Sequence, residues 1–130
     1  MQRRTYLKSI LAATAATPVL AADTTAHPIQ LHVDLTVDPA KEKEMLNTFH
    51  KTFRPAATKQ PGFIDAKILK LRSTLAGTAP QGVNYRFVLI FQTEELRQKW
   101  VASAIHQKVW PMMESTLKHK NYNVILFDVA

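Results

Sequence analysis

The sequence predicts an α+β domain whose elements follow the order β-α-β-β-α-β. Apolar and polar residues alternate from Ile29 to Val37, which is the pattern of a strand with one buried face. Large apolar residues then recur at helical spacing, which predicts a helix after that strand. The run Tyr85–Phe91 is apolar on both sides in its centre, so it predicts a strand that is covered on both faces.

The first helix follows the first strand directly. Asp38-Pro39 combines an N-cap residue with a first-turn proline, so we expect the helix to begin there. It ends near Lys59, before Pro61-Gly62, and we expect a distortion at Pro55. Its apolar stripe consists of Met45, Leu46, Phe49 and Phe53. The second strand then covers residues 63–71.

The second half of the unit repeats this order. Residues 73–83 form a loose connection to the third strand at 85–91. Thr93 caps the next helix, and Ser103 begins a further helical segment. The side of that segment expected to be buried consists of Ile105, Val109, Met112, Met113, Thr116 and Leu117. The last strand is predicted at 122–129.

These elements make a ferredoxin-like unit, in which helices cover one face of a sheet. The other face of the predicted sheet is apolar at several positions, and no element of the chain is left to cover it. A symmetric dimer that packs sheet against sheet would bury that face. We therefore expect a homodimer.

The N-terminus has the order of an export signal. A basic segment at 1–8 precedes an alanine-rich apolar run at 9–20 and a small-residue cleavage site, and the run is too short for a stable membrane span. The motif Arg3–Lys8 resembles the twin-arginine signal, and a general secretory signal is the alternative. We expect residues 1–22 to be a cleavable signal and 23–130 to be the working domain. The predicted localisation is therefore exported, either periplasmic or secreted.

Composition excludes several classes of function. The predicted signal holds three of the seventeen Lys and Arg residues and none of the ten Asp and Glu, so the mature chain is less basic than the whole. Its charges are scattered, which argues against a nucleic-acid partner, and we expect no membrane partner after signal removal. The chain has no cysteine, so disulfides, thiol catalysis and thiolate metal sites are excluded.

Motifs for other chemistries are absent from the sequence. It contains no nucleophile elbow of the Gly-x-Ser-x-Gly type and no His-Glu-x-x-His metal motif. Three glycines in the whole chain are too few for a glycine-rich phosphate loop. We therefore predict no metal site.

Two runs of sequence resemble a known family. Arg54–Ala57 with Gln60–Ile64 lies at the turn after the first helix, and a second run extends from Phe91 through Trp100 to Trp110-Pro111. On a ferredoxin-like unit of this size, these runs resemble the antibiotic biosynthesis monooxygenase family over essentially the whole mature chain. The resemblance implies a dimeric α+β barrel. The family includes quinol-type monooxygenases that need no metal or flavin, haem-degrading enzymes, and members without known chemistry. On this basis we expect no cofactor.

Three residues are candidates for catalysis. Trp100 matches the helix tryptophan that lines the pocket of active family members, although a core position is the alternative. His106 is a candidate general base or hydrogen-bond donor, because histidine titrates near neutral pH; a polar residue at a helix start is the alternative. His32, on the first strand, is the third candidate.

Four further residues are predicted to bind the substrate. Asp34 shares a strand face with His32, and that face points either at the helices or between two subunits. The other three predicted substrate-binding residues are His50, Arg86 and Trp110. Trp110 stands where the haem-degrading relatives carry a histidine, and His106 lies one turn earlier, so the resemblance does not extend to haem degradation.

Two functions follow from these residues. One is an exported, cofactor-independent monooxygenase that acts on a small aromatic or quinol-like compound. The other is a non-catalytic dimeric barrel that binds a small hydrophobic ligand or has a stress-related role. Active relatives place an asparagine on the first strand, and residues 29–37 contain none, which favours the second function. Trp100 and His106 favour the first.

Overall fold

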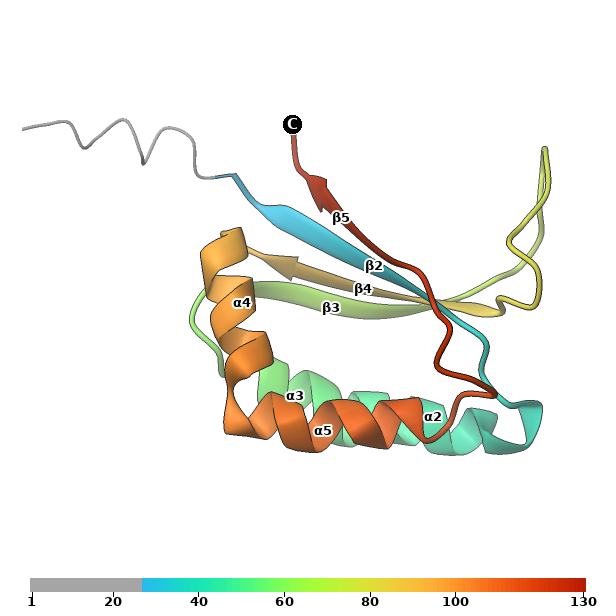
Figure 1. Cartoon of the computed structure of the whole chain (residues 1–130), viewed down its shortest axis with the longest axis horizontal. Coiled ribbons are helices and arrows are strands. Elements are labelled where there is room, and N and C mark those ends of the chain that lie inside the picture. The colour runs from blue at the N-terminus through green and yellow to red at the C-terminus, as the bar shows by residue number, and fades with distance from the viewer. Residues whose placement is uncertain (1–26) are drawn as a thin grey trace, which may run out of the picture.

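A computed structural model describes residues 27–130 of the chain, so the predicted export signal lies outside the described residues. Along the chain, one helical segment lies between the first two strands, and two helices lie between the third strand and the last (Figure 1). The strands and the second pair of helices are β2 (Ile29–Leu35), β3 (Phe63–Lys70), β4 (Tyr85–Phe91), α4 (Glu94–Ala102), α5 (Ala104–Glu114) and β5 (Val124–Asp128). The predicted order β-α-β-β-α-β is confirmed, with the second helix divided in two.

The first helical segment runs without a break and widens to a π-helix in its middle. Its parts are a 3-10 turn (Pro39–Lys41), α2 (Glu42–Thr48), a π-helical segment (Phe49–Phe53) and α3 (Arg54–Thr58). Asp38 Oδ1 caps the start by accepting a hydrogen bond from the Ala40 amide at 2.9 Å. The widening lies immediately before Pro55, where the proline ring would clash with the carbonyl one turn back. The predicted distortion is therefore confirmed.

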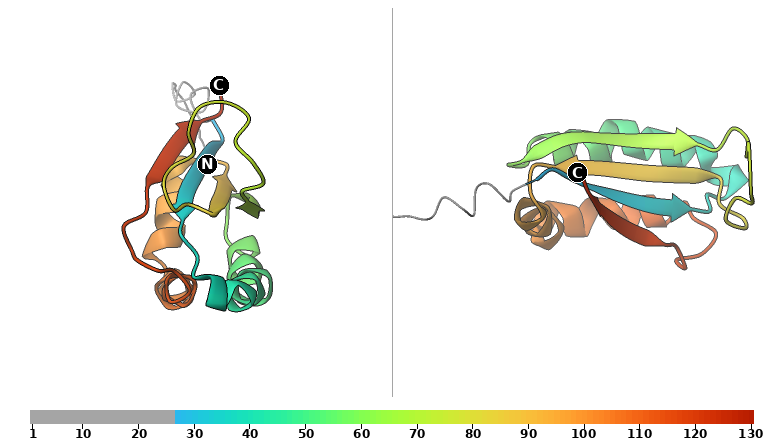
Figure 2. Two further views of the ribbon diagram at one scale, coloured as in Figure 1. Left: turned by 90° about the vertical axis from the view of Figure 1, so that its right-hand side faces the viewer. Right: turned by 90° about the horizontal axis from the view of Figure 1, so that it is seen from above.

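The four strands form one antiparallel sheet in the order β3-β4-β2-β5. Val33 in the central strand β2 pairs with Phe87 on one side and with Val124 on the other. Both helical layers lie on the same face of this sheet (Figures 1 and 2). This arrangement confirms the ferredoxin-like α+β fold.

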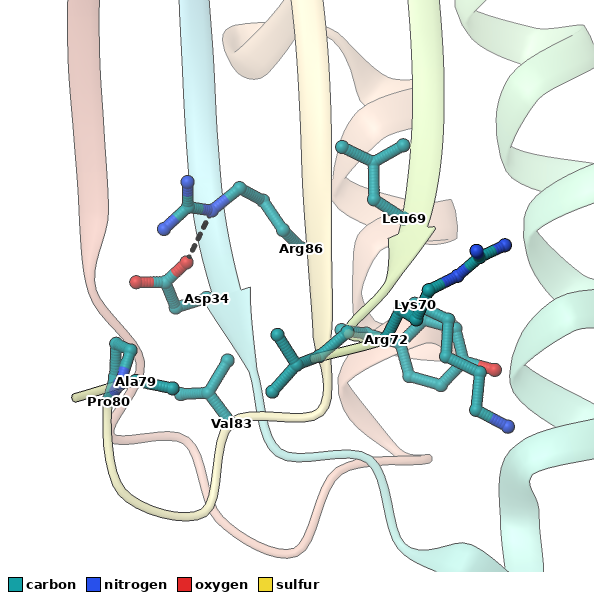
Figure 3. A pocket seen from close by; sticks show the side chains of 10 residues that line it. Asp34, Leu69, Lys70, Arg72, Ala79, Pro80, Val83 and Arg86 are labelled. Carbon is teal, nitrogen blue, oxygen red and sulfur yellow. Dashed lines mark hydrogen bonds and ion pairs between the residues drawn. The ribbon is translucent and has the colours of Figure 1, made fainter. Parts of the chain in front are cut away.

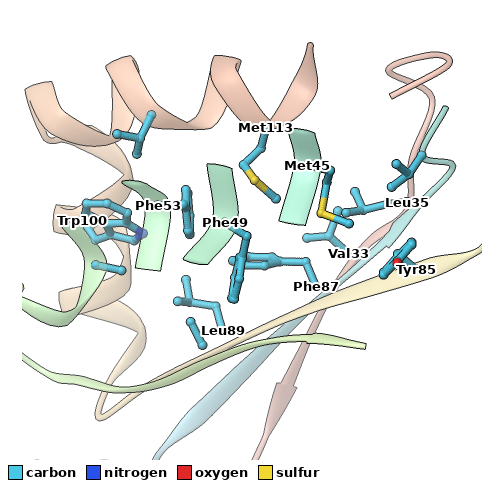
Figure 4. Packing of buried hydrophobic residues seen from close by; sticks show 14 of the residues in the cluster. Val33, Leu35, Met45, Phe49, Phe53, Tyr85, Phe87, Leu89, Trp100 and Met113 are labelled. Carbon is cyan, nitrogen blue, oxygen red and sulfur yellow. The ribbon is translucent and has the colours of Figure 1, made fainter. Parts of the chain in front are cut away.

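Aromatic side chains fill the space between the sheet and the helices (Figure 4). The rings of Phe49 and Phe53 contact Phe87 edge to face, with centroids 6.0 and 5.2 Å apart. Met45 and Met113 are buried from the two helical layers. Burying side chains of this size stabilises the fold by roughly 1.5–3 kcal/mol each.

The bounds of three strands and the burial of two side chains differ from the prediction; the second strand ends at Lys70, one residue early. The first strand ends at Leu35 because Val37 forms only an isolated bridge to Leu117, and the last strand is shortened to 124–128. Ile105 and Met112 are exposed rather than buried. The buried stripe of α5 and the residues that follow it consists of Val109, Met113 and Thr116, whose spacing keeps them on one side.

The second face of the sheet carries no helix in the part of the chain described here (Figure 2). Apolar side chains remain exposed on it, including Leu69, Ile125 and Phe127. The edge strand β5 is exposed at every residue. None of the helices within 27–130 combines the length and the apolar content needed to cross a membrane.

Candidate functional site

A cavity of about 190 Å³ lies between the helix-facing side of the sheet and the pair α4–α5. Most of its walls are apolar, as is usual for small-molecule sites. Pockets for drug-sized ligands typically hold about 300–1,000 Å³, so this one suits a small compound. It is lined by Leu31, Val33, Phe53, Phe87, Leu89, Arg97, Trp100, Val101, His106, Trp110, Tyr122 and Val124.

The junction between α4 and α5 brings Trp100 and His106 together. The Ser103 hydroxyl donates to the Trp100 carbonyl at 2.6 Å and accepts from the His106 amide at 3.2 Å. One serine thus closes the first helix and caps the second. As a result, the Trp100 and His106 rings meet edge to face with centroids 5.0 Å apart.

Aromatic rings surround His106 on several sides. The Trp110 ring stacks on it at 6.3 Å, with an interplanar angle of 13°. Phe53, from the first helical layer, lies within 6.4 Å of His106 and within 5.8 Å of Trp100. This packing holds the imidazole in one orientation and leaves it half-buried.

Two buried polar atoms of the cavity lack a hydrogen-bond partner within residues 27–130: Trp100 Nε1 and His106 Nδ1. Trp100 is only 1% exposed, and its nitrogen lies on the side turned toward Phe53 (Figure 4). A buried donor or acceptor without a partner costs about 1–3 kcal/mol. Such atoms are expected where a ligand supplies the missing contact.

The indole N–H of Trp110, the second tryptophan in the cavity wall, has a hydrogen-bond partner. Trp110 Nε1 donates to the Tyr122 hydroxyl at 3.1 Å, and that hydroxyl donates to Glu114 Oε2 at 2.6 Å. Burial, and then the bond to Glu114, raises the pKa of Tyr122. Tyr122 is therefore held neutral by a bond directed away from the cavity.

The positively charged side chain of Arg97 also lines this cavity. Arg97, on the first turns of α4, donates from Nε and Nη2 to the two carboxylate oxygens of Glu94, both at 2.6 Å. Burial, and then the positive charge of Arg97, lowers the pKa of His106 below its ordinary value. His106 is therefore neutral at pH 7 and has a lone pair available.

The structure brings together three of the predicted site residues and separates the other four. Trp100, His106 and Trp110 line one cavity. His50 is exposed on the first helix and faces a shallow groove beside β3. It is not a wall of the cavity, because the first helix turns Phe53 toward that space instead.

His32, Asp34 and Arg86 lie on the other face of the sheet, because side chains alternate along each strand. Asp34 Oδ1 accepts from Arg86 Nε at 2.8 Å beside a separate hollow at the end of the sheet (Figure 3). Burial, and then the charge of Arg86, lowers the pKa of His32. The thickness of the sheet separates these three residues from Trp100, so they cannot complete the site around it.

Nine of the twelve cavity residues were not predicted as site residues, among them Arg97, Phe53 and Tyr122. Arg97 precedes Trp100 by three residues, which places both on one face of a helix, and this spacing could have identified it from the sequence. Residues 27–130 bring no three His, Cys, Asp or Glu side chains together as a metal site.

Comparisons with known proteins show similarity in structure rather than in sequence. No family model matches this chain. No curated protein matches it in sequence. SnoaB, a cofactor-independent oxygenase from Streptomyces nogalater, superposes with a TM-score of 0.59 at 15% identity, over 81% of this chain and 95% of SnoaB.

Two further structures are similar. A candidate antibiotic biosynthesis monooxygenase from Caulobacter crescentus gives a TM-score of 0.63 at 17% identity, over 81% of this chain and 92% of its own. A dimeric ferredoxin-like protein of unknown function from Jannaschia gives 0.66 at 13% identity, over 78% of this chain and 99% of its own. Identities this low carry the fold alone. The chain therefore has the ferredoxin-like α+β fold found in the antibiotic biosynthesis monooxygenases, and at the level of fold the resemblance is confirmed.

Proposed function

We propose that this protein is an exported, cofactor-independent monooxygenase that oxidises a small aromatic or quinol-like compound in the cavity between the sheet and α4–α5. The observation that carries the proposal is the pairing of Trp100 with a neutral, half-buried His106 inside an aromatic-walled cavity. The fold shared with a cofactor-independent oxygenase supports it.

The chemistry requires a phenol in its anionic form. His106 accepts the phenolic proton, and the apolar walls exclude water from the resulting anion. The phenolate transfers one electron to dioxygen, and the phenoxyl radical and superoxide then combine at the para carbon as a peroxide. Cleavage of the O–O bond, with loss of the C–H proton, releases water and leaves a quinone. One phenol and one dioxygen thus give one quinone and one water, and the substrate supplies all the electrons.

The test is oxygen uptake by the purified protein with a panel of quinols and hydroxylated polycyclic aromatics. We expect His106→Ala to lower the rate about a hundredfold or more, the usual effect of losing a general base. Trp100→Phe should also lower it, because it removes the indole nitrogen. His27→Ala replaces an exposed histidine that does not line the cavity and should leave the rate unchanged. Absence of uptake with every compound, or equal rates in the two histidine variants, would refute the enzyme assignment.

A non-catalytic binding protein is the second candidate. The observation in its favour is that β2 contributes only Leu31 and Val33 to the cavity, so this strand supplies no polar group to a reaction. Both candidates predict binding of a small aromatic compound. They differ in oxygen uptake, which the binding protein would not show.

We further propose that two copies form a homodimer through the uncovered face of the sheet. Exposed apolar residues on β3 and β5 support this, because a patch of this kind usually marks an interface. A structurally similar protein is described as dimeric, which agrees with the proposal. The ion pair between Asp34 and Arg86 would then lie in the interface.

Leu69→Glu is expected to dissociate this dimer. Leu69 is 46% exposed on the uncovered face. In a two-fold symmetric dimer the interface would bury two new carboxylates, and each would weaken association by several kcal/mol. Leu75→Glu makes the same change at a loop residue that is 95% exposed, and should have no effect. Light scattering at micromolar concentration should give twice the subunit mass for the natural chain and for Leu75→Glu, and one subunit mass for Leu69→Glu. A monomeric natural chain would contradict the proposal.

A further inference from the structure

The strand β3 forms one edge of the sheet, on the side of the first helical segment (Figure 2). In an antiparallel pair, the backbone groups of successive residues point alternately toward the partner strand and away from it. The Leu71 amide donates to the Asn84 carbonyl at 2.9 Å, so Leu71 points toward the β4 side. By the same alternation, Lys70 and Ile68 direct their N–H and C=O groups away from β4, toward solvent.

The edge is closed at one residue, Ala66. Its carbonyl accepts a hydrogen bond from Arg54 Nε at 3.1 Å, and its amide donates to Asp65 Oδ1 at 2.8 Å. Arg54 Nη2 also donates to Asp65 Oδ1, at 2.9 Å, which holds the two side chains together over the edge. A strand added to β3 would have to displace both of them to pair beyond Ala66. The open part of the edge is therefore the short stretch Ile68–Lys70.

A groove of about 620 Å³ lies beside this open stretch, between β3 and the first helical segment. Its lining includes Phe49 and Tyr85, which are 1% and 3% exposed, and the partly buried Leu46 and Ile68. Successive side chains of a strand point to opposite faces, so an added strand would direct every second side chain toward this groove. Extended peptides bind to edge strands in this way, with main-chain hydrogen bonds for affinity and pockets for alternate side chains.

The charged side chains that line the groove are cations. They are Arg54, Lys67 and Lys70, and among the described residues no carboxylate lines it. Arg54 and Lys70 are paired with Asp65 and Glu42, at 2.9 and 2.6 Å. Lys67 is 55% exposed, and its Nζ lies 4.0 Å from Asp65 Oδ2, beyond hydrogen-bond distance. Two β3 edges side by side would bring these lysines together, so the edge favours an acidic partner over a second copy of itself.

We propose that the groove beside β3 binds an extended acidic segment of another protein, which adds a strand along Ile68–Lys70. Main-chain hydrogen bonds to Ile68 and Lys70 hold the segment, and an apolar side chain packs on Leu46 in the groove. Lys67 and Ile68 point to opposite faces because they are neighbours on a strand, so the segment alternates acidic and apolar residues. This surface shares no residue with the cavity between the sheet and α4–α5, and the proposal does not depend on the function of that cavity.

The test uses a fluorescein-labelled peptide of three Glu-Val repeats, whose binding to the purified protein raises the fluorescence anisotropy of the label. Three Lys-Val repeats are the control for charge. The Glu-Val peptide with an N-methylated backbone is the control for strand pairing, because it keeps the side chains and loses the N–H groups. We expect only the unmodified Glu-Val peptide to bind. In the complex, the amides of Ile68 and Lys70 should exchange with solvent more slowly than in the free protein.

Two substitutions separate the backbone from the charge. Lys70→Pro removes an N–H that points away from β4, which an edge strand tolerates, and should weaken binding about tenfold more than Lys70→Gln does. Lys67→Glu should abolish binding of the Glu-Val peptide, whereas Lys99→Glu, the same change at an exposed position on α4, should not.

Three results overturn the proposal. The first is that the Glu-Val peptide does not bind, and the second is that its N-methylated form binds equally well, which would make the contact one of charge alone. The third is that the amides of Ile68 and Lys70 are already protected from exchange in the free protein, which would mean that a second copy occupies the edge. The peptide controls use the natural chain, so they decide the matter even if Lys70→Pro does not fold.

Discussion

Replacing Gly62 with alanine is expected to destabilise the fold by about 2–5 kcal/mol. Gly62 has a φ of +85°, a left-handed conformation that costs other residues roughly 1–2 kcal/mol. A Cβ atom there would lie 2.5 Å from Leu96 Cδ1 and 2.9 Å from Leu96 Cβ, and overpacking of this kind costs about 1–3 kcal/mol more. The turn cannot move away easily, because the Gly62 carbonyl accepts a hydrogen bond of 2.7 Å from the Gln92 amide.

Gly77→Ala is the matched control for this experiment. Gly77 also has a positive φ, of +74°, but a Cβ there would meet nothing within 4 Å. The Gly77→Ala variant should therefore lose only the part of the unfolding free energy that comes from the positive φ, about 1–2 kcal/mol. Leu96→Ala in the Gly62→Ala background should recover part of the loss, which urea unfolding would measure as a coupling free energy. Equal losses in the two glycine variants would show that the contact with Leu96 is unimportant.

The contact between Gly62 and Leu96 has a consequence for the site. Leu96 lies on α4 next to Arg97 and one turn before Trp100, so the close approach at Gly62 sets how near this helix lies to the start of β3. In the sequence, Pro61-Gly62 predicts only the end of the first helix. The structure adds a second reason for glycine, since only the absence of a side chain lets α4 approach this turn.

The elements were predictable because each depends on a local pattern. In β2, Ile29, Val33 and Leu35 are buried against the helices, in agreement with the period of two. The boundaries were less predictable, because Val37 continues the alternation but pairs only with Leu117. Such long-range pairing leaves no local trace in the sequence.

The site was only partly predictable, for two physical reasons. The alternation in β2 separates His32 and Asp34 from the apolar residues but does not say whether polar residues face a pocket or a partner, since a dimeric barrel buries both faces. An arginine on a helix is usually exposed to solvent, so the sequence does not indicate that Arg97 lines a cavity. Its burial arises from the packing of α4 over the sheet. Trp100 and His106 could be chosen as candidates because the chain has only two tryptophans and five histidines.

Replacing Phe53 with alanine is expected to cost about 3–5 kcal/mol of unfolding free energy, the usual range for a buried phenylalanine. Phe53 contacts the rings of Phe87, Trp100 and Trp110, with centroids between 5.2 and 5.8 Å away. Its removal would also extend the candidate ligand cavity, because the Phe53 ring is one of the walls. The expected variant is a weaker fold with a larger site.

Phe49→Ala separates these two effects. Phe49 is as deeply buried and belongs to the same helical segment, but it does not line the cavity. Both variants should lose similar stability in thermal unfolding. An apolar probe such as naphthalene should then raise the melting temperature of Phe53→Ala more than that of Phe49→Ala, because ligand binding to the native state adds stability. Equal shifts would mean that the probe fills whichever void the mutation leaves. A larger shift for Phe53→Ala would show that the space between the sheet and α4–α5 accepts an aromatic ring, which both candidate functions require.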